Sequence, residues 1–204
     1  MQRLFFLLAS LGFVALLATG APAGNDAAAQ FVQKMGDKAL SSLTGRDINM
    51  AERETRVRDL LRNNFDVPTI GRFALGTHWK AATEAERAEY MKLFESMIVK
   101  TYAQRFSEYE GQEFKVGGTT PAGKDFLVAS QILQDGGPAV IVEWRVRDSG
   151  SGMKVIDVLV EGISMSVTQR SDFSSVIQQG GGKMSALLSS LRSHQGIKKS
   201  AKAG

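Results

Sequence analysis

The spacing of apolar residues changes at Gly111, and this change constrains the fold more than any other feature of the sequence. Before Gly111, apolar residues recur at steps of three and four, which is typical of amphipathic helices. The helices predicted in this way lie at about 27–43, 50–64 and 83–109. Thr83 and Glu86 form a capping box at the start of the third. After Gly111 the period is two, which predicts strands.

The clearest predicted strand is the segment AVIVEWRVR at 139–147. Its apolar residues Val142, Trp144 and Val146 face one way, and its charged residues face the other. A hairpin loop at 148–152 follows, and a return strand leads back from it. The apolar face of the return strand is expected to carry Ile156, Val158 and Val160.

The alternation of the return strand changes parity at Glu161–Gly162. A single β-bulge there would restore the apolar residues to the inner face, and glycine favours such a bulge. We therefore expect the strand to continue, with Ile163 and Met165 on the inner face. Ser164 and Ser166 would then lie on the outer face.

Two further helices are expected after the strands, one around Phe173 and one around Leu188, with glycines at 180–182 between them. Helices, then an antiparallel meander, then helices indicate an α+β fold. We expect a strongly curved antiparallel sheet of about four strands, with helices packed on one face. Periodicity alone does not distinguish a filled interior from a hollow one.

The N-terminal residues are typical of a secretory signal peptide. A positive residue, Arg3, precedes an apolar run at 4–18, and small residues at 21–23 fit a cleavage site. A retained N-terminal anchor is the alternative, but no second apolar segment long enough to span a bilayer follows. The chain is then expected to divide into a signal peptide at 1–23, a single domain at 24–193 and a flexible basic tail at 194–204.

The composition argues against several classes of function. The chain has no cysteine, which excludes disulfides, thiol catalysis and thiolate metal sites. Its 25 Lys and Arg residues are interspersed with 21 Asp and Glu residues, so the net charge gives no argument for nucleic acid binding. The two histidines, His78 and His194, are too far apart in the sequence to predict a metal site.

The segment VIDVLVEGISMSV at 155–167 is the main candidate for catalysis, because it sets carboxylates and hydroxyls in an apolar strand. Within it, GISMS departs from the G-x-S-x-G nucleophile motif at the last glycine and lies inside an expected strand. We expect Asp157 and Glu161 on the outer face of the sheet, where water and a cross-strand arginine would meet them. The polar residues of this segment are therefore interpreted as the solvent-exposed face of a sheet.

Two blocks of the sequence resemble the MlaC family, the soluble periplasmic phospholipid carriers of the Mla transport system. In the block at 63–114 the matching residues are Phe65, Asp66, Leu75, Gly76, Trp79, Glu86, Arg87, Thr101, Tyr102, Tyr109 and Gly111. In the block at 155–177 they are Asp157, Val158, Glu161, Gly162, Ser164, Arg170 and Phe173. The chain departs from the family pattern at 180–182, where three glycines stand in place of one, and this leaves the lipid class open.

The resemblance implies an apolar cavity between the bent sheet and the helices that takes acyl chains. The candidate lipid-binding residues are the apolar side chains expected to line it: Phe73, Leu75, Trp79, Phe94, Met97, Tyr102, Phe106, Val128, Val142, Trp144, Val146, Ile156, Val158, Val160, Ile163 and Met165. Arg105 is the candidate for the lipid headgroup, although a snorkelling side chain is the simpler explanation for its position. No catalytic residue, metal or cofactor is expected.

The resemblance also implies the partners. They are a phospholipid ligand, an inner-membrane ABC transporter complex and an outer-membrane lipoprotein complex of the Mla type. The contacts with these membrane complexes are expected to be transient. The protein itself is expected to be a monomer that does not bind nucleic acid. Three alternatives stay open. The first is a hopanoid-related lipid-binding protein of the same family, and the second is a small periplasmic enzyme with Tyr90 or Tyr102 as proton donor beside Asp157. The third is an adaptor with a solid core that binds only proteins.

Overall fold

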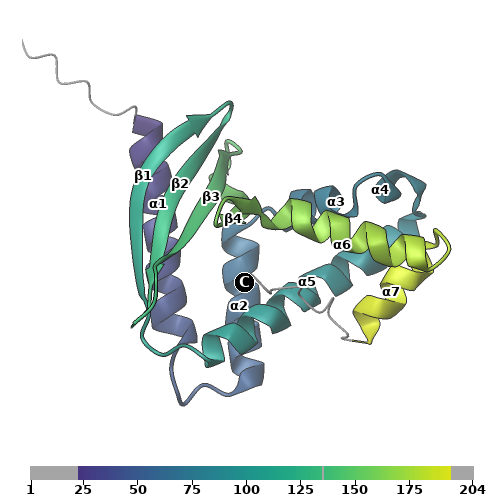
Figure 1. Cartoon of the computed structure of the whole chain (residues 1–204), viewed down its shortest axis with the longest axis horizontal. Coiled ribbons are helices and arrows are strands. Elements are labelled where there is room, and N and C mark those ends of the chain that lie inside the picture. The colour runs from purple at the N-terminus through teal and green to yellow at the C-terminus, as the bar shows by residue number, and fades with distance from the viewer. Residues whose placement is uncertain (1–22, 135, 194–204) are drawn as a thin grey trace, which may run out of the picture.

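The structure, a computed structural model, describes residues 23–134 and 136–193 (Figure 1). Apart from Ala23, the expected signal peptide and basic tail lie outside these residues. The helices of the described part are α1 (Ala23–Leu43), α2 (Met50–Asn64), α3 (Val67–Leu75), α4 (His78–Ala81), α5 (Glu84–Ser107), α6 (Met165–Gln179) and α7 (Met184–Arg192). The strands are β1 (Glu113–Ala122), β2 (Asp125–Leu133), β3 (Val140–Asp148), β4 (Met153–Val160) and β5 (Ile163–Ser164).

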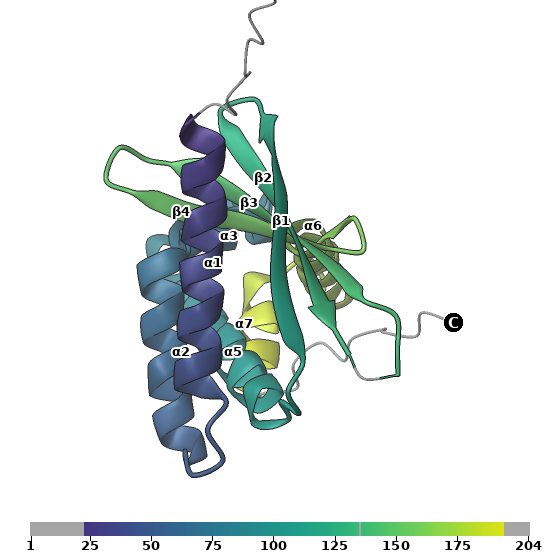
Figure 2. The ribbon, with the colours of Figure 1, turned by 90° about the vertical axis from the view of Figure 1, so that its left-hand side faces the viewer.

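The strands form one antiparallel sheet in the order β1-β2-β3-β4-β5. The register places Trp144 of β3 between Val128 of β2 and Val158 of β4, so these three side chains share a face. The pairing shifts once in β1, after Val116, and once between β3 and β4, after Arg145. Such irregularities bend strands, and the sheet is strongly curled, with α1 lying along its β1 side (Figures 1 and 2).

Helix α1 covers the inner face of β1 and β2. Gly36 allows the close approach, because a side chain there would clash with the Phe114 ring of β1. We call the apolar residues buried at this contact the sheet cluster: Ala28, Val32, Met35, Val128, Val146 and Val155. Helix α1 thus anchors β1 and β2, while β4 contacts α2, α3 and α6.

A second apolar cluster, the helical cluster, is formed by buried residues of α2, α3, α5, α6 and α7, with a few from the neighbouring segments. Its central helix, α5, begins with the capping box that the sequence predicts: the Thr83 hydroxyl accepts from the Glu86 N–H at 3.2 Å, and the Glu86 carboxylate accepts from the Thr83 N–H at 2.8 Å. Tyr90 and Phe94 of α5 stack with ring centroids 5.6 Å apart, and Phe173 of α6 meets both edge-on. All three rings are buried.

The predicted α+β class, with a curved antiparallel sheet and helices on one face, is confirmed. The bulge expected at Glu161–Gly162 is wrong. These residues form a tight turn, with φ of 50° and 75°, between β4 and the two-residue strand β5. Positive φ at both central residues is the geometry of a type I′ hairpin turn. Met165 therefore begins helix α6 and does not continue a strand.

Candidate functional site

The candidate lipid-binding residues of β2 and β3 share the inner face of the sheet, as the alternation predicts. Val128, Val142 and Val146 are buried there. The partly covered side chains of the same face are Trp144, Val158 and Val160. Partial cover means that these side chains would lose further contact with water if an apolar ligand packed on them.

One position of this face differs from the expectation. The register shift after Arg145 pairs Val146 with Val155 and leaves Ile156 as the extra residue of a bulge. Val155 is fully buried in the sheet cluster, whereas Ile156 is partly exposed. Strict alternation back from Val160 places Ile156 on the inner face, whereas Val155 takes that position in the structure. The sequence analysis missed this bulge because nothing in the local sequence marks it.

Ser130 is a residue of the inner face that the sequence analysis missed. Its hydroxyl donates to the Val142 carbonyl at 2.8 Å and accepts from the indole N–H of Trp144 at 2.9 Å. The hydroxyl is buried, and these two bonds satisfy it. The network fixes the orientation of the Trp144 ring on the inner face. The sequence signal that could have identified Ser130 is a serine at a strand position where the alternation calls for an apolar residue.

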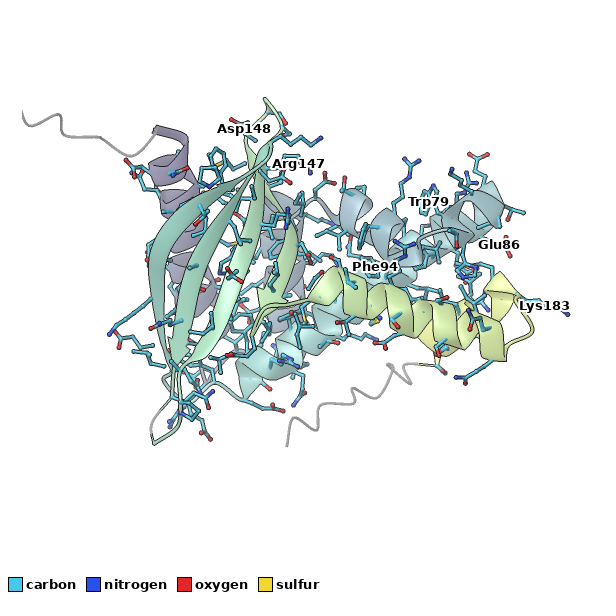
Figure 3. The ribbon with its side chains drawn as sticks, turned by 45° about the horizontal axis from the view of Figure 1, so that its top comes forward. Trp79, Glu86, Phe94, Arg147, Asp148 and Lys183 are labelled. Carbon is cyan, nitrogen blue, oxygen red and sulfur yellow. The ribbon has the colours of Figure 1, made fainter. Side chains whose placement is uncertain are left out.

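The candidates of the helices lie in or against a different cluster. Those buried in the helical cluster or packed at its edge are Leu75, Trp79, Phe94, Met97 and Phe106. Figure 3 shows Trp79 and Phe94 in the helical part, well away from Arg147 at one end of the sheet. Leu60 and Phe65 contact both clusters, and the Phe65 ring meets Trp144 edge-on at 6.5 Å. The structure therefore brings the candidates together as two groups, not as one.

Three candidates are largely exposed. Phe73, Tyr102 and Ile163 keep 43%, 41% and 61% of their surface in contact with solvent. These side chains therefore do not line an enclosed interior in this structure. Arg105 is also exposed, with its guanidinium 5.9 Å from the centre of the Tyr102 ring. Met165, in the first turn of α6, is partly buried.

Asp157 caps helix α6. Its carboxylate accepts from the Ser164 hydroxyl at 2.6 Å and from the Ser166 N–H at 3.1 Å. The Ser164 hydroxyl in turn accepts from the Val167 N–H, as an N-cap does. The expectation that Ser164 and Ser166 lie on the outer face of a strand is therefore wrong, and Ser166 is buried. These polar groups set where α6 leaves the sheet.

The residues of the enzyme alternative are not assembled. The Tyr90 hydroxyl donates to the Gly71 carbonyl at 2.8 Å, and burial raises the pKa of Tyr90 well above its usual value. Asp157 is engaged at the start of α6, and Tyr102 lies at the surface beside Arg105. The described residues hold no group of three or more His, Asp or Glu side chains placed to bind a metal.

Two hollows lie on the helical part. The first, which we call the α2–α5 groove, has a volume of about 570 Å³ and is lined by Arg62, Phe65, Val67, Pro68, Thr69, Arg72, Trp79, Met91, Lys92 and Glu95. The second, of about 450 Å³, lies between α3 and α6 beside Phe73, Val167 and Arg170. Neither is lined by residues of the sheet, and both are open. The expected enclosed cavity is not shown by the described residues and stays a prediction.

None of the helices in the described ranges combines the length and the apolar character that crossing a bilayer requires. The apolar surface of this part of the chain is instead distributed between the two clusters and the partly covered inner face of the sheet.

The chain is similar to known proteins over most of its length. Residues 31–193 match the family described as MlaC protein. The intermembrane phospholipid transport system binding protein MlaC of Haemophilus influenzae is 23% identical, over 79% of each chain. A phospholipid-binding protein from Ralstonia solanacearum, solved in complex with a phospholipid, is 24% identical with a TM-score of 0.71. The match covers 84% of this chain and 99% of that one, and it shows a shared fold.

Proposed function

The chain belongs to the MlaC family, and from this membership we propose that it is a periplasmic carrier that binds phospholipid by the acyl chains. In this proposal the signal peptide at 1–23 directs export, the domain at 24–193 holds the lipid, and a basic tail follows at 194–204. The names of the similar proteins support the ligand class, since one belongs to a phospholipid transport system and the other was solved with a phospholipid.

The observation that carries the proposal is the partly covered inner face of the sheet. Helix α1 packs on β1 and β2, whereas Trp144, Val158 and Val160 of β3 and β4 remain partly exposed. Acyl chains packed on these side chains bury apolar surface on both partners. We place the chains between the sheet cluster and the helical cluster, which Leu60 and Phe65 connect. Arg105 and Tyr102 lie at the exposed edge, where a phosphate headgroup meets water.

We propose that lipid separates the two clusters as it enters, because the two hollows described above are open surface features. In the lipid-bound state the remaining candidates of the two faces line the space: Leu75, Phe94, Met97, Phe106, Val128, Val142, Val146, Ile156, Ile163 and Met165. Trp79 and Phe73 lie beside the outer hollows, so we expect them to contribute least. In this proposal the side chains of the sheet cluster move apart to admit the acyl chains.

A carrier of this kind needs no catalytic step. Exposing two acyl chains of about 30 methylenes to water costs roughly 25 kcal/mol at ~0.8 kcal/mol per methylene, so unaided transfer through water is slow. A protein with an apolar interior removes most of that cost, and exchange with a donor or acceptor is then nearly isoenergetic. We propose that the monomer moves phospholipid between an outer-membrane lipoprotein complex and an inner-membrane ABC transporter, without cofactor or metal.

The test is extraction of the purified protein with organic solvent, followed by mass spectrometry. The expected result is about one phospholipid per chain. A hopanoid in the extract would favour the alternative within the family. Repeated preparations without lipid, and no uptake of fluorescent phospholipid from vesicles, would instead favour an adaptor with a solid core.

A further inference from the structure

The α2–α5 groove has a largely apolar lining and is open to solvent. The apolar part of the lining includes Phe65, Val67, Met91 and Trp79, and the hollow of about 570 Å³ is open to solvent. Trp79 is held in place by Arg87, which donates to the Trp79 carbonyl at 2.8 Å and lies 5.5 Å from the indole ring. A rigid aromatic side chain in a surface groove is a typical anchor for a protein partner.

The charge around the groove is predominantly positive. The only acidic side chain of its lining, Glu95, is already engaged by Arg62 at 2.8 Å and by Arg58 at 3.4 Å. Within the described ranges, no carboxylate forms an ion pair with Arg72 or Lys92. Two cations at the rim are therefore available to a negatively charged partner.

The Trp79 side chain adds a hydrogen-bond donor to this surface. Its indole N–H has no acceptor among the residues that the structure describes, and the Arg72 guanidinium lies 5.9 Å from the ring. An occupant that carries acceptor oxygens satisfies the indole and both cations at once.

From these features we propose that the α2–α5 groove docks an acidic segment of a partner protein, with a large apolar side chain inserted beside Trp79 and carboxylates on Arg72 and Lys92. A bilayer surface fits less well, because membrane docking uses protruding apolar side chains and these line a hollow. An acyl chain also fits poorly, because the open side of the groove would leave it in contact with water. Arg72 and Lys92, which the test changes, are not among the candidate lipid-binding residues, so the docking test can fail while lipid binding stands.

Binding is measured by fluorescence anisotropy of a short fluorescein-labelled peptide that alternates Asp with Leu. The unaltered full chain should bind it saturably at low ionic strength, and the affinity should fall as salt rises. The variant Arg72→Glu with Lys92→Glu should bind at least about tenfold more weakly. Lys34→Glu with Lys38→Glu on α1 changes the net charge equally, outside the groove, and should bind like the unaltered chain.

Three further arms separate the alternatives. A peptide with Asn in place of Asp should bind more weakly, and phosphatidylglycerol vesicles should not compete for the groove. Extracted lipid should be unchanged in the groove variant, which distinguishes a failed docking site from a failed carrier. If circular dichroism shows that the Glu variant is unfolded, Arg72→Gln with Lys92→Gln replaces it, with a loss of about threefold or more expected.

The proposal is overturned if the unaltered chain does not bind the acidic peptide saturably. Equal losses in the groove variant and the α1 variant would also overturn it, because they would show that only net charge matters. Vesicle binding that disappears with Arg72 and Lys92, without peptide binding, would overturn it in favour of a membrane surface.

Discussion

The sheet cluster and the helical cluster are packed in different ways. At the centre of the helical cluster, the rings of Tyr90, Phe94 and Phe173 interlock and are at most 2% exposed. In the sheet cluster, the buried strand residues are all valines that form one cluster with Ala28, Val32 and Met35 of α1, and Trp144 beside them stays partly covered. The interlocked rings leave no room between them for a ligand, so in our proposal they form a rigid wall beside the lipid, whereas a single aliphatic layer can separate from its neighbour. The comparison suggests that the helical half supplies stability and the sheet half supplies binding.

The largest expected effect comes from breaking the helical cluster. Phe94→Ala removes a ring that contacts two other buried rings, and we expect a loss of about 3–5 kcal/mol in the free energy of unfolding. The measurement is urea unfolding followed by circular dichroism. Phe73→Ala, at a position 43% exposed, is the matched control and should cost less than about 1 kcal/mol. A cost of Phe94→Ala near that of the control would mean that the helical cluster is not the solid half.

The sequence analysis placed the helical and sheet candidates in one cavity and did not predict this division, but it did predict the parts of the fold that depend on local information. Thr83 and Glu86 predicted the start of α5, and the alternation around Trp144 predicted the inner face, because capping and strand periodicity depend on near neighbours. Long-range contacts could not be predicted in this way. The change of parity at Glu161–Gly162 fits a bulge or a turn equally well. The choice depends on the pairing of β5 with β4 and on a hydrogen bond from Ser164 to Asp157.

A second prediction tests the binding half. Val160→Glu places a carboxylate on the inner face of the sheet, where Val160 pairs with Val142. Because Val160 is partly covered, we expect the variant to fold with a loss of about 2 kcal/mol in the free energy of unfolding. The amount of bound lipid should fall at least tenfold. Val167→Glu, at a position 54% exposed, is the control and should retain lipid. Lipid content by mass spectrometry and unfolding in urea are the measurements, and normal lipid content in Val160→Glu would remove the inner face from the site.

The junction between the halves should depend on Asp157. Asp157→Asn keeps the shape of the side chain but removes the negative charge of the group that accepts hydrogen bonds from Ser164 and from the first turn of α6. We therefore expect a loss of about 1–2 kcal/mol in the free energy of unfolding. Asp172→Asn, farther along α6, is the control and should cost less than about 0.5 kcal/mol. Lipid transfer between vesicles should persist in both variants. Abolished transfer in a folded Asp157→Asn protein would revive the enzyme alternative.

Acid should lower the free energy of unfolding by about 1 kcal/mol through the ion pair between Arg147 and Asp125 in the sheet. Arg147 donates to Asp125 at 2.6 and 2.9 Å, and these bonds lower the pKa of Asp125. A lowered pKa in the folded state contributes stability above the unfolded pKa of about 3.9, and this contribution is lost as the pH falls through the folded value. Arg147→Met should therefore be less stable than the unaltered chain at neutral pH, with the difference shrinking below about pH 4. A difference independent of pH would exclude the carboxylate as its source.

The smallest expected effect lies at the turn that joins the sheet to α6. Glu161 has a φ of 50°, which costs a residue with a side chain about 1 kcal/mol, but its carboxylate accepts from the Ile141 N–H at 2.7 Å. Glu161→Gly relieves the strain and loses the bond, so we expect stability within about 0.5 kcal/mol of the unaltered chain. Glu161→Ala keeps the strain, loses the same bond and should be about 1 kcal/mol less stable than the glycine variant. Equal stability of the two variants in urea would show that the turn relaxes. The connection between the clusters would then be looser than the backbone geometry implies.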